Sequence, residues 1–358
     1  MSSLEEQFEK ALMEITLSDS GKHLLEAEAV TECVVSGDNV TITLDLPADD
    51  SVRKSISDQV ISRLESIDGI SKVNIKMADQ VDNGGHDHHH HAEPRGPQRP
   101  ENPVYLRNYD HIIAVSSGKG GVGKSTVAVN LAITLAKMGQ QVSLFDSDVY
   151  GPSVPIMMGM RSTKPRMNDR GIMVMEKYGI SLMSIGNLIE ESAATIWRGP
   201  IVHQVIDQML RDTIWPGGNF MIIDLPPGTG DAQLTLSQVL EISGAVVVST
   251  PQDVALLDAM KGIAMFEKVD VPILGLVENM SSFICPNCEH ETPIFDKGNA
   301  EKASSQHNIP FLGSIPIELA VREGGDNGAP IATIDQETPS TLAFKHIANR
   351  VIEEVGKL

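Results

Sequence analysis

The stretch SGKGGVGKST, Ser117–Thr126, decides the fold of most of this 358-residue chain. It directly follows the apolar run HIIAVSS and opens the helical stretch STVAVNLAITLAKMG, so it joins a predicted strand to a predicted helix. From Gly118 to Ser125 it fits the pattern G-x-x-x-x-G-K-S/T, whose glycines let backbone N–H groups turn inward around phosphate oxygens. The helix N-terminus adds the positive end of its dipole. The sequence therefore predicts a phosphate-binding loop (P-loop) in an α/β fold.

Two side chains of this loop have separate predicted tasks. Lys124 should neutralise the β- and γ-phosphates of a nucleotide, and the Ser125 hydroxyl should ligate Mg²⁺. A glycine-rich turn without a ligand does not account for the coincidence of motif, strand and helix. The other loop residues predicted to bind the nucleotide are Gly118, Lys119, Gly120, Gly121, Val122, Gly123 and Thr126.

Two acidic segments complete the predicted site. LFDSDVYGPS places Asp146 and Asp148 at the end of the next strand, where α/β proteins bind ligands. MIIDLPPGTGD places Asp224 at the end of a very apolar strand, where we expect it to hold Mg²⁺ through water. Asp148 is the candidate for orienting the attacking water. Strand-end aspartates also cap helices, and this alternative weighs more against Asp148 and Asp146 than against Asp224.

Beyond about Leu106, short apolar runs alternate with helical stretches. The runs are IIAVSS, QVSLFDSD, FMIIDLP, AVVVSTP, ILGLVENM and FLGSIP. Such alternation predicts a mostly parallel sheet with helices on both faces. The methionine-rich stretch 155–186 lies among these runs, and it predicts adaptable packing or a partner-binding surface.

The first 80 residues have a different pattern. The alternating run NVTITLDL, an apolar stripe at helical spacing in SVRKSISDQVISRLESI and the run VNIKM predict a small α+β domain. Residues 81–105 are rich in Gly, Pro, His and charge, and they predict a flexible linker. Its tract HDHHHH, His86–His91, is either a solvated spacer or a loose metal binder, and we favour the spacer. The predicted domains are therefore 1–80 and 106–358.

Composition limits the classes of partner. The formal net charge of −20 argues against a general binder of nucleic acid or anionic membranes, because both need a positive surface. The polar start MSSLEEQFEK is not a secretory signal, and no run reaches the roughly 20 apolar residues of a membrane span. Three cysteines do not make a disulfide framework, so we expect a cytoplasmic protein.

From Ile112 to about Pro330 the chain resembles the Mrp/ApbC family of P-loop iron–sulfur carrier ATPases, relatives of MinD and the nitrogenase iron protein. The segments that carry the resemblance are SGKGGVGKST, DSDVYGPSVP, WRGP, IIDLPPGTGDAQLTLSQ, TPQDVALLDAMKGIAMFEKV, ENMSSFICPNC and LGSIPIE. It implies a deviant Walker A P-loop NTPase that binds and hydrolyses ATP and delivers a cluster to apo-proteins, with scaffold proteins as further partners.

The resemblance also implies roles for particular residues. Lys119, early in the loop, is the lysine that in this class reaches the nucleotide of the partner in a homodimer. Lys119, Lys124, Asp148 and Asp224 would be the catalytic residues. Asn279 and the loop around Pro316 and Glu318 match the adenine-binding positions of the family.

The segment ICPNCEH holds two of the three cysteines, Cys285 and Cys288. Iron–sulfur clusters want four protein ligands, so two thiolates from each chain suffice if two chains meet on a twofold axis. We therefore expect a bridging cluster, most simply [4Fe–4S]. Zinc ranks second, bound either at a site that includes His290 or between two chains by four sulfurs. A redox pair, which needs a helix N-terminus to lower a thiol pKa, ranks third.

Residues 1–80 resemble, more weakly, the small iron–sulfur assembly-associated domain that is often fused to these carriers. Cys33, in the strand-like run TECVVSG, is interpreted as a buried apolar residue rather than a ligand. Partner docking is the expected role of this domain.

A positioning ATPase like MinD or ParA is the alternative function. It shares the P-loop and Lys119 but needs no cysteine pair, and it requires a membrane- or DNA-binding surface. The C-terminal helix TLAFKHIANRVIEEVGKL has an apolar stripe at Leu342, Ile347, Val351 and Val355, but Glu353 and Glu354 make it a poor membrane anchor. We expect this helix to pack on the sheet.

Overall fold

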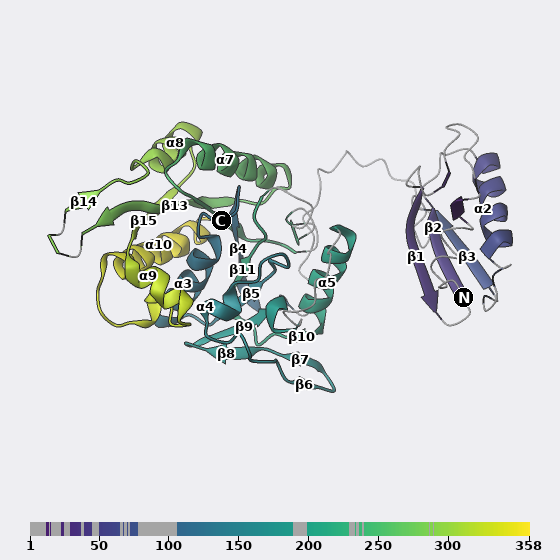
Figure 1. The fold of residues 1–358 in the computed structure, drawn as a ribbon, viewed down its shortest axis with the longest axis horizontal. Coiled ribbons are helices and arrows are strands. Elements are labelled where there is room, and N and C mark those ends of the chain that lie inside the picture. The colour runs from purple at the N-terminus through teal and green to yellow at the C-terminus, as the bar shows by residue number, and fades with distance from the viewer. Residues whose placement is uncertain are drawn as a thin grey trace. The chain divides into compact units, whose positions relative to one another are not determined.

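The computed structural model describes residues 106–358 except 189–198, 229–232, 234–235, 238–239, 286 and 289, together with 12–13, 15, 23–24, 29–36, 39–44, 50–64, 67, 70 and 72–77. The chain divides into two compact units, Met1–Pro94 and Arg95–Leu358 (Figure 1). The predicted linker, with its histidine tract, lies outside the described residues.

The first unit is a three-stranded sheet with one long helix. Strands β1 (Val30–Ser36) and β2 (Asn39–Leu44) pair antiparallel, and β2 pairs in parallel with β3 (Lys72–Met77). The parallel pairing requires a crossover, which α2 (Asp50–Leu64) supplies. Apolar side chains of both layers form the core, among them Val40, Ile42, Ile56, Val60 and Leu64. The predicted strands and helix are present, and β1 contains Cys33, whose side-chain surroundings lie outside the described residues.

The second unit is built on a nine-stranded sheet. Its path runs β14-β13-β12-β4-β11-β5-β9-β8, and β15 also pairs with β13. All pairs are parallel except those made by β14 and β8 at the two ends of the path. The strands are β4 (Tyr109–Ser117), β5 (Val142–Asp146), β8 (Met175–Lys177), β9 (Ile180–Ser184), β11 (Gly218–Asp224), β12 (Gly244–Ser249), β13 (Ile273–Ile284), β14 (Glu291–Thr292) and β15 (Phe311–Ile317). A small separate sheet holds β6 (Met167–Asn168), β7 (Gly171–Met173) and β10 (Thr213–Ile214).

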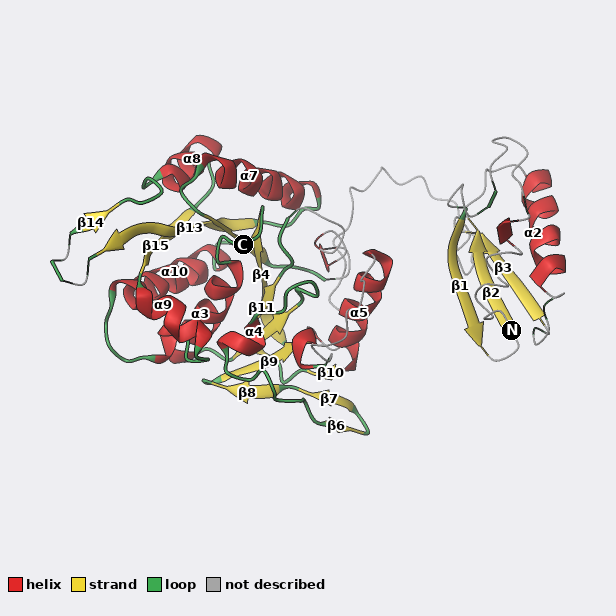
Figure 2. Ribbon diagram, in the orientation of Figure 1, coloured by secondary structure: helices red, strands yellow, loops and turns green. Residues whose placement is uncertain are grey.

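Helices cover both faces of the large sheet (Figure 2). Ile113 and Val115 of β4 are buried in one cluster with α3 (Lys124–Lys137) and α10 (Pro339–Val355). The alternate residues of β4, Ile112 and Ala114, are buried in a second cluster with α5 (Gly199–Asp212) and α7 (Asp253–Lys268). This alternation follows from the pleat of a strand, and it confirms the predicted parallel sheet between two helical layers. Further helices whose bounds the structure describes are α4 (Val154–Met157), α8 (Asn299–His307), α9 (Leu319–Asp326) and the 3₁₀ turns η3 (Ile185–Asn187) and η4 (Ile331–Thr333).

The six apolar runs all form strands of the large sheet. Strand β13 continues beyond its run ILGLVENM to Ile284, which directly precedes the cysteine pair. Helix α10 packs against the sheet as expected through Ile347, Val351 and Val355, whereas Leu342 is 47% exposed. No helix in the described part of the chain is long and apolar enough to cross a membrane.

The parallel order brings several strand ends to one edge. Strand β4 ends at Ser117, where the phosphate loop begins. Next to β4, on the side away from β12, β11 ends at Asp224, which lies opposite Asp146 at the end of β5. Strand β9 follows, and its Ser184 lies opposite Asp146. Because carboxyl ends of parallel strands share an edge, residues far apart in sequence meet there.

Candidate nucleotide site and cysteine hairpin

The phosphate loop joins β4 to α3. Gly121 and Gly123 have φ angles of +83° and +84°, in the left-handed region that favours glycine. Gly118 is required for another reason, because an added Cβ would lie 2.1 Å from the backbone carbonyl carbon of Asp258 in α7. The N-cap of α3 is Gly123, so no N-cap side chain bonds the first N–H groups of the helix. These groups are available to an anion.

Lys124 and two carboxylates form the charged centre of the site. Lys124 Nζ lies 2.6 Å from Asp224 Oδ1 and 3.7 Å from Asp148 Oδ2. It also donates to Ser125 Oγ at 3.1 Å. Burial raises the pKa of Asp224, and the charge of Lys124 opposes that rise. Anionic phosphate groups would compete with these carboxylates for the lysine.

The donor set beside Lys124 fits a magnesium ion. Asp224 is fully buried, and its second oxygen, Oδ2, accepts no hydrogen bond from the described residues. An orphaned buried oxygen costs free energy unless a cation or water satisfies it. The Ser125 hydroxyl is within reach of the same lysine amine, so two hard oxygen donors of the kind that Mg²⁺ prefers lie close together.

Asp146 lies beside Asp224 but makes different contacts. Its Oδ2 accepts from Ser184 Oγ at 2.7 Å, and its Oδ1 accepts from the backbone N of Asp148 at 3.2 Å. Burial, and then the nearby charge of Asp224, raise the pKa of Asp146 to about 8. Asp146 therefore does not simply cap a helix, which was the alternative considered for strand-end aspartates.

The raised pKa of Asp146 predicts a pH-dependent stability. The unfolded chain releases this proton near pH 4, whereas the folded protein keeps it until about pH 8. The folded state binds more protons in this window, so its free energy of unfolding should fall as pH rises from about 4 to 8. Asp146→Asn should flatten that decline, which denaturant unfolding at several pH values measures. An unchanged slope in the Asn variant would contradict the assignment.

Two adjoining cavities open at this edge of the sheet. The first, of about 290 Å³, is lined by the phosphate loop and by Asp148. The second, of about 480 Å³, shares Gly123, Thr126, Ser153 and Met157 with the first. One cavity thus offers N–H groups and a lysine, and the next offers a larger and mainly apolar space. Together they have the form of a site for a phosphate chain and a base.

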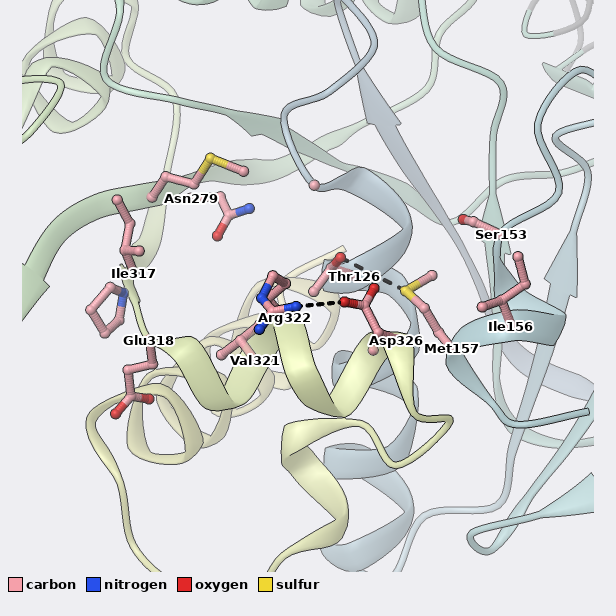
Figure 3. Close-up of a pocket in the computed structure, with 14 residues that line it drawn as sticks. Thr126, Ser153, Ile156, Met157, Asn279, Ile317, Glu318, Val321, Arg322 and Asp326 are labelled. Atoms are coloured by element: carbon pink, nitrogen blue, oxygen red, sulfur yellow. Dashed lines mark hydrogen bonds and ion pairs between the residues drawn. The ribbon is translucent and has the colours of Figure 1, made fainter.

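The three predicted adenine positions all line the second cavity (Figure 3). Asn279, from β13, donates from Nδ2 to the carbonyl of Val122 in the phosphate loop at 2.8 Å. Pro316 lies in β15. Glu318 turns its carboxylate toward α10, where Oε2 accepts from the backbone N of Ser340 at 2.9 Å. Its charge therefore stabilises the N-terminus of α10, and only the rest of the residue faces the cavity.

Other residues of this cavity were not predicted. Met157 lines both cavities from α4, although the methionine-rich stretch predicts only packing or a partner surface. Val321 and Arg322 contribute from α9, where Arg322 pairs with Asp326 at 2.9 Å (Figure 3). The position of Met157 four residues after the end of DSDVYGPS was the available signal, because that segment was already predicted to lie at the phosphate site.

Lys119 lies in the loop but outside the charged centre. Its side chain is half-buried, and it makes no hydrogen bond or ion pair with the residues that the structure describes. Its carbonyl accepts from Ser117 Oγ at 2.9 Å, which fixes the start of the loop. Among the residues that the structure describes, the Lys119 ammonium group therefore belongs to the loop but not to the ion pairs around Asp224. The WRGP segment begins outside the described residues, which resume at Gly199.

The cysteine pair lies on a β-hairpin. Phe283 and Ile284 of β13 pair with Thr292 and Glu291 of β14, and Cys285 N donates to the His290 carbonyl at 3.0 Å. Cys285 is half-buried and Cys288 is exposed. Hydrogen bonds from the backbone N–H groups of Asn287 and Cys288 lower the pKa of the Cys285 thiol. The turn thus favours a thiolate at the protein surface.

This geometry bears on the competing uses of the cysteines. No group of three or more Cys, His, Asp or Glu side chains converges within the described part of the chain, so Cys285, Cys288 and His290 do not form a ligand set by themselves. The pair follows a strand and not a helix N-terminus, so the lowered pKa of the Cys285 thiol comes from backbone N–H groups of the turn and not from a helix dipole. Within the described residues, the two cysteines therefore have no further ligands that would complete a four-coordinate site.

Fold, loop and cavities define a P-loop nucleotide-binding protein of the NTPase class. Residues 108–352 match the family described as NUBPL iron-transfer P-loop NTPase, and residues 5–77 match the family described as iron-sulfur cluster assembly protein. The chain belongs to the NUBPL iron-transfer P-loop NTPase family.

Named relatives agree with this assignment. An iron-sulfur cluster carrier protein of Escherichia coli (strain K12) is 46% identical over 259 residues, which cover 72% of this chain and 70% of that one. A protein of the same name from Synechocystis is 39% identical over 341 residues, or 94% and 93% of the two chains. A solved nucleotide-binding protein from Archaeoglobus fulgidus, in complex with ADP, is 37% identical, with a TM-score of 0.58 over 65% of this chain and 91% of that one.

Proposed function

We propose that this protein is an ATP-hydrolysing carrier that holds a [4Fe–4S] cluster between two protomers and delivers it to apo-proteins. The observation that carries the proposal is a surface hairpin with only two cysteines, on the same unit as a P-loop. Two copies would supply the four thiolates that a cluster needs. The iron–sulfur carrier names of the relatives support the same cargo.

The residues of the nucleotide site have separate proposed roles. Lys124 and the N-terminus of α3 bind the phosphates, while Ser125 and Asp224 would hold Mg²⁺, which supplies charge stabilisation to the phosphate oxygens. Asp148, 3.7 Å from Lys124, orients the attacking water. Asn279 and Pro316 contact the base. In each protomer Lys119 reaches the nucleotide of the partner.

The cluster site is proposed to be coupled to nucleotide state through the dimer. Lys119 and the cysteines would act at two places of one interface, so ATP binding would change how firmly the cluster is held. Such coupling is reciprocal in binding free energy. The small first unit is proposed to dock apo-proteins or a scaffold, with the linker at 81–105 between the units. Cysteine usage is compatible with the cytoplasm. A positioning ATPase would not use the hairpin.

The test is paired. Full-length protein, reconstituted anaerobically with iron and sulfide, should transfer its cluster to an apo-ferredoxin faster with MgATP than without it. Lys119→Ala should still bind ATP, because Lys124 and the loop remain. It should lose hydrolysis by on the order of 10²-fold, since a cation aimed at developing charge is removed. It should also lose the stimulation of transfer.

Two results would revise the proposal in different ways. Wild-type protein that takes up no iron would reject the carrier role. Normal ATP-stimulated transfer by a hydrolysis-deficient Lys119→Ala protein would keep the carrier and remove turnover from delivery.

A further inference from the structure

Ser184 and Asp146 form a buried pair beside the phosphate site. They are register partners at the ends of β9 and β5, and Ser184 Oγ donates to Asp146 Oδ2 at 2.7 Å. Both residues are fully buried, and neither lines the two cavities. Burying a carboxyl group is costly unless its oxygens are bonded, so a pair kept at this place needs an explanation. None of the roles proposed for the nucleotide site involves Ser184 or Asp146.

The pair is connected to Asp148 through the backbone. The N–H of Asp148 donates to the other oxygen of Asp146, Oδ1, at 3.2 Å. Between them, Ser147 donates its N–H and its hydroxyl to the carbonyl of Asp224, at 3.0 and 2.8 Å. The turn 146–148 is therefore fixed on two sides, to β9 through Asp146 and to β11 through Ser147. Its fixed orientation holds the Asp148 carboxylate near Lys124.

Ser184 also supports the chain that follows Asp148. Its Oγ accepts from the backbone N of Gly186 at 3.1 Å and so begins η3. A Cβ added at Gly186 would lie 3.0 Å from Pro152, which places η3 directly against the segment after Asp148. Within that segment, the N–H of Gly151 donates to Asp148 Oδ1 at 3.2 Å. The Ser184 hydroxyl thus helps to hold Asp148 in place from two directions, through Asp146 before it in the chain and through η3 and Pro152 after it.

We propose that Ser184 and Asp146 are positioning residues that hold Asp148 in the orientation required to place the attacking water. The inference rests on the proposed ATP hydrolysis and on the role proposed for Asp148. Neither Ser184 nor Asp146 touches the reacting atoms. Loss of the Ser184 hydroxyl leaves an oxygen of Asp146 buried without its donor, so the Asp146 side chain shifts and releases the N–H of Asp148. A small misplacement of a catalytic group is enough to slow the chemical step without loss of binding.

Ser184→Ala tests the inference in the full-length protein. We expect kcat for ATP to fall by about tenfold, whereas KM and the Kd of a non-hydrolysable ATP analogue stay within about twofold. Ser184→Thr keeps the hydroxyl and should recover most of the turnover. The matched control is Ser143→Ala, because Ser143 is a buried serine of β5 whose Oγ accepts one hydrogen bond, from Tyr109 at 2.6 Å. The control should lower the melting temperature about as much as Ser184→Ala does, and it should leave kcat unchanged.

Gly186→Ala approaches the same contact from the other side. It keeps the Ser184 hydroxyl but adds a methyl group against Pro152, so it should lower kcat with the same unchanged analogue binding. This variant keeps the inference testable if Ser184→Ala does not fold.

Three results would overturn the inference. Wild-type turnover in Ser184→Ala is one. A loss of analogue binding as large as the loss of kcat is another, because it would indicate a role in the binding site or the fold. Wild-type protein without any ATP turnover would reject the proposed ATPase and this inference together, whereas an active wild type with an unaffected Ser184→Ala rejects the inference alone.

Discussion

Lys124→Ala is expected to lower ATP turnover by on the order of 10²–10³-fold, because the variant loses the cation that stabilises charge on the transferred phosphate. The structure adds a second consequence. Lys124 Nζ lies 2.6 Å from Asp224, so the same change leaves a fully buried carboxylate without its cationic partner. The measurement is steady-state ATP hydrolysis by highly purified protein, together with thermal unfolding.

Two further variants separate catalysis from folding. In the double variant Lys124→Met/Asp224→Asn both partners are neutral. The destabilisation caused by an unpaired buried charge is therefore removed, while ATP hydrolysis should stay absent. Lys137→Ala is the matched control, because Lys137 lies on the same helix and pairs with the exposed Asp335 at 3.0 Å. That control should hydrolyse ATP like the wild type. Turnover of Lys124→Ala within a few-fold of the wild type would exclude this lysine from the chemistry.

The sheet was largely predictable because its central strands are buried on both faces. Strand β12, for example, is buried at every position, and its sequence GAVVVS is apolar up to the final serine. Strand β9 was not predicted, although it pairs directly with β5. Its sequence, ISLMS, is short and lies in a stretch of methionines, glycines and charges without a period of two or 3.6. The segment ISLMS forms a strand because it pairs with β5 and is buried against the helices.

The functional site likewise has one part that the sequence predicts and another that it does not. The loop and its strand–helix context are local, so the spacing of glycines, lysine and serine was enough to predict it. The Lys124–Asp224 contact spans 100 positions in the sequence, and only the apolar strand before Asp224 pointed to it. Ser184 and the contact of Glu318 with α10 depend on strand order and on helix docking, for which the sequence has no local signal. The hairpin was partly predicted, since its two cysteines were evident while the extension of β13 was not.

Cys285→Ala and Cys288→Ala are each expected to abolish cluster binding. In a twofold dimer one substitution removes two of the four thiolates, so a single change has a double effect. Anaerobic reconstitution should give about four iron and four sulfide per wild-type dimer, with a broad visible absorption, and almost none in either variant. Nucleotide binding should stay within about twofold of the wild type, because neither cysteine lines the two cavities at the P-loop.

The control and the stoichiometry together decide among the metals. Cys33→Ala should reconstitute fully, because Cys33 lies in the other compact unit and is not a predicted ligand. Zinc bound by the same four thiolates would give about one metal per dimer, no sulfide and no visible absorption. Either cysteine variant that retains full iron and sulfide would show that its thiolate is not a ligand. Loss of iron in only one of them would replace the symmetric four-thiolate site by a cluster with an additional ligand, for which the exposed His290 at the end of the same turn is a candidate.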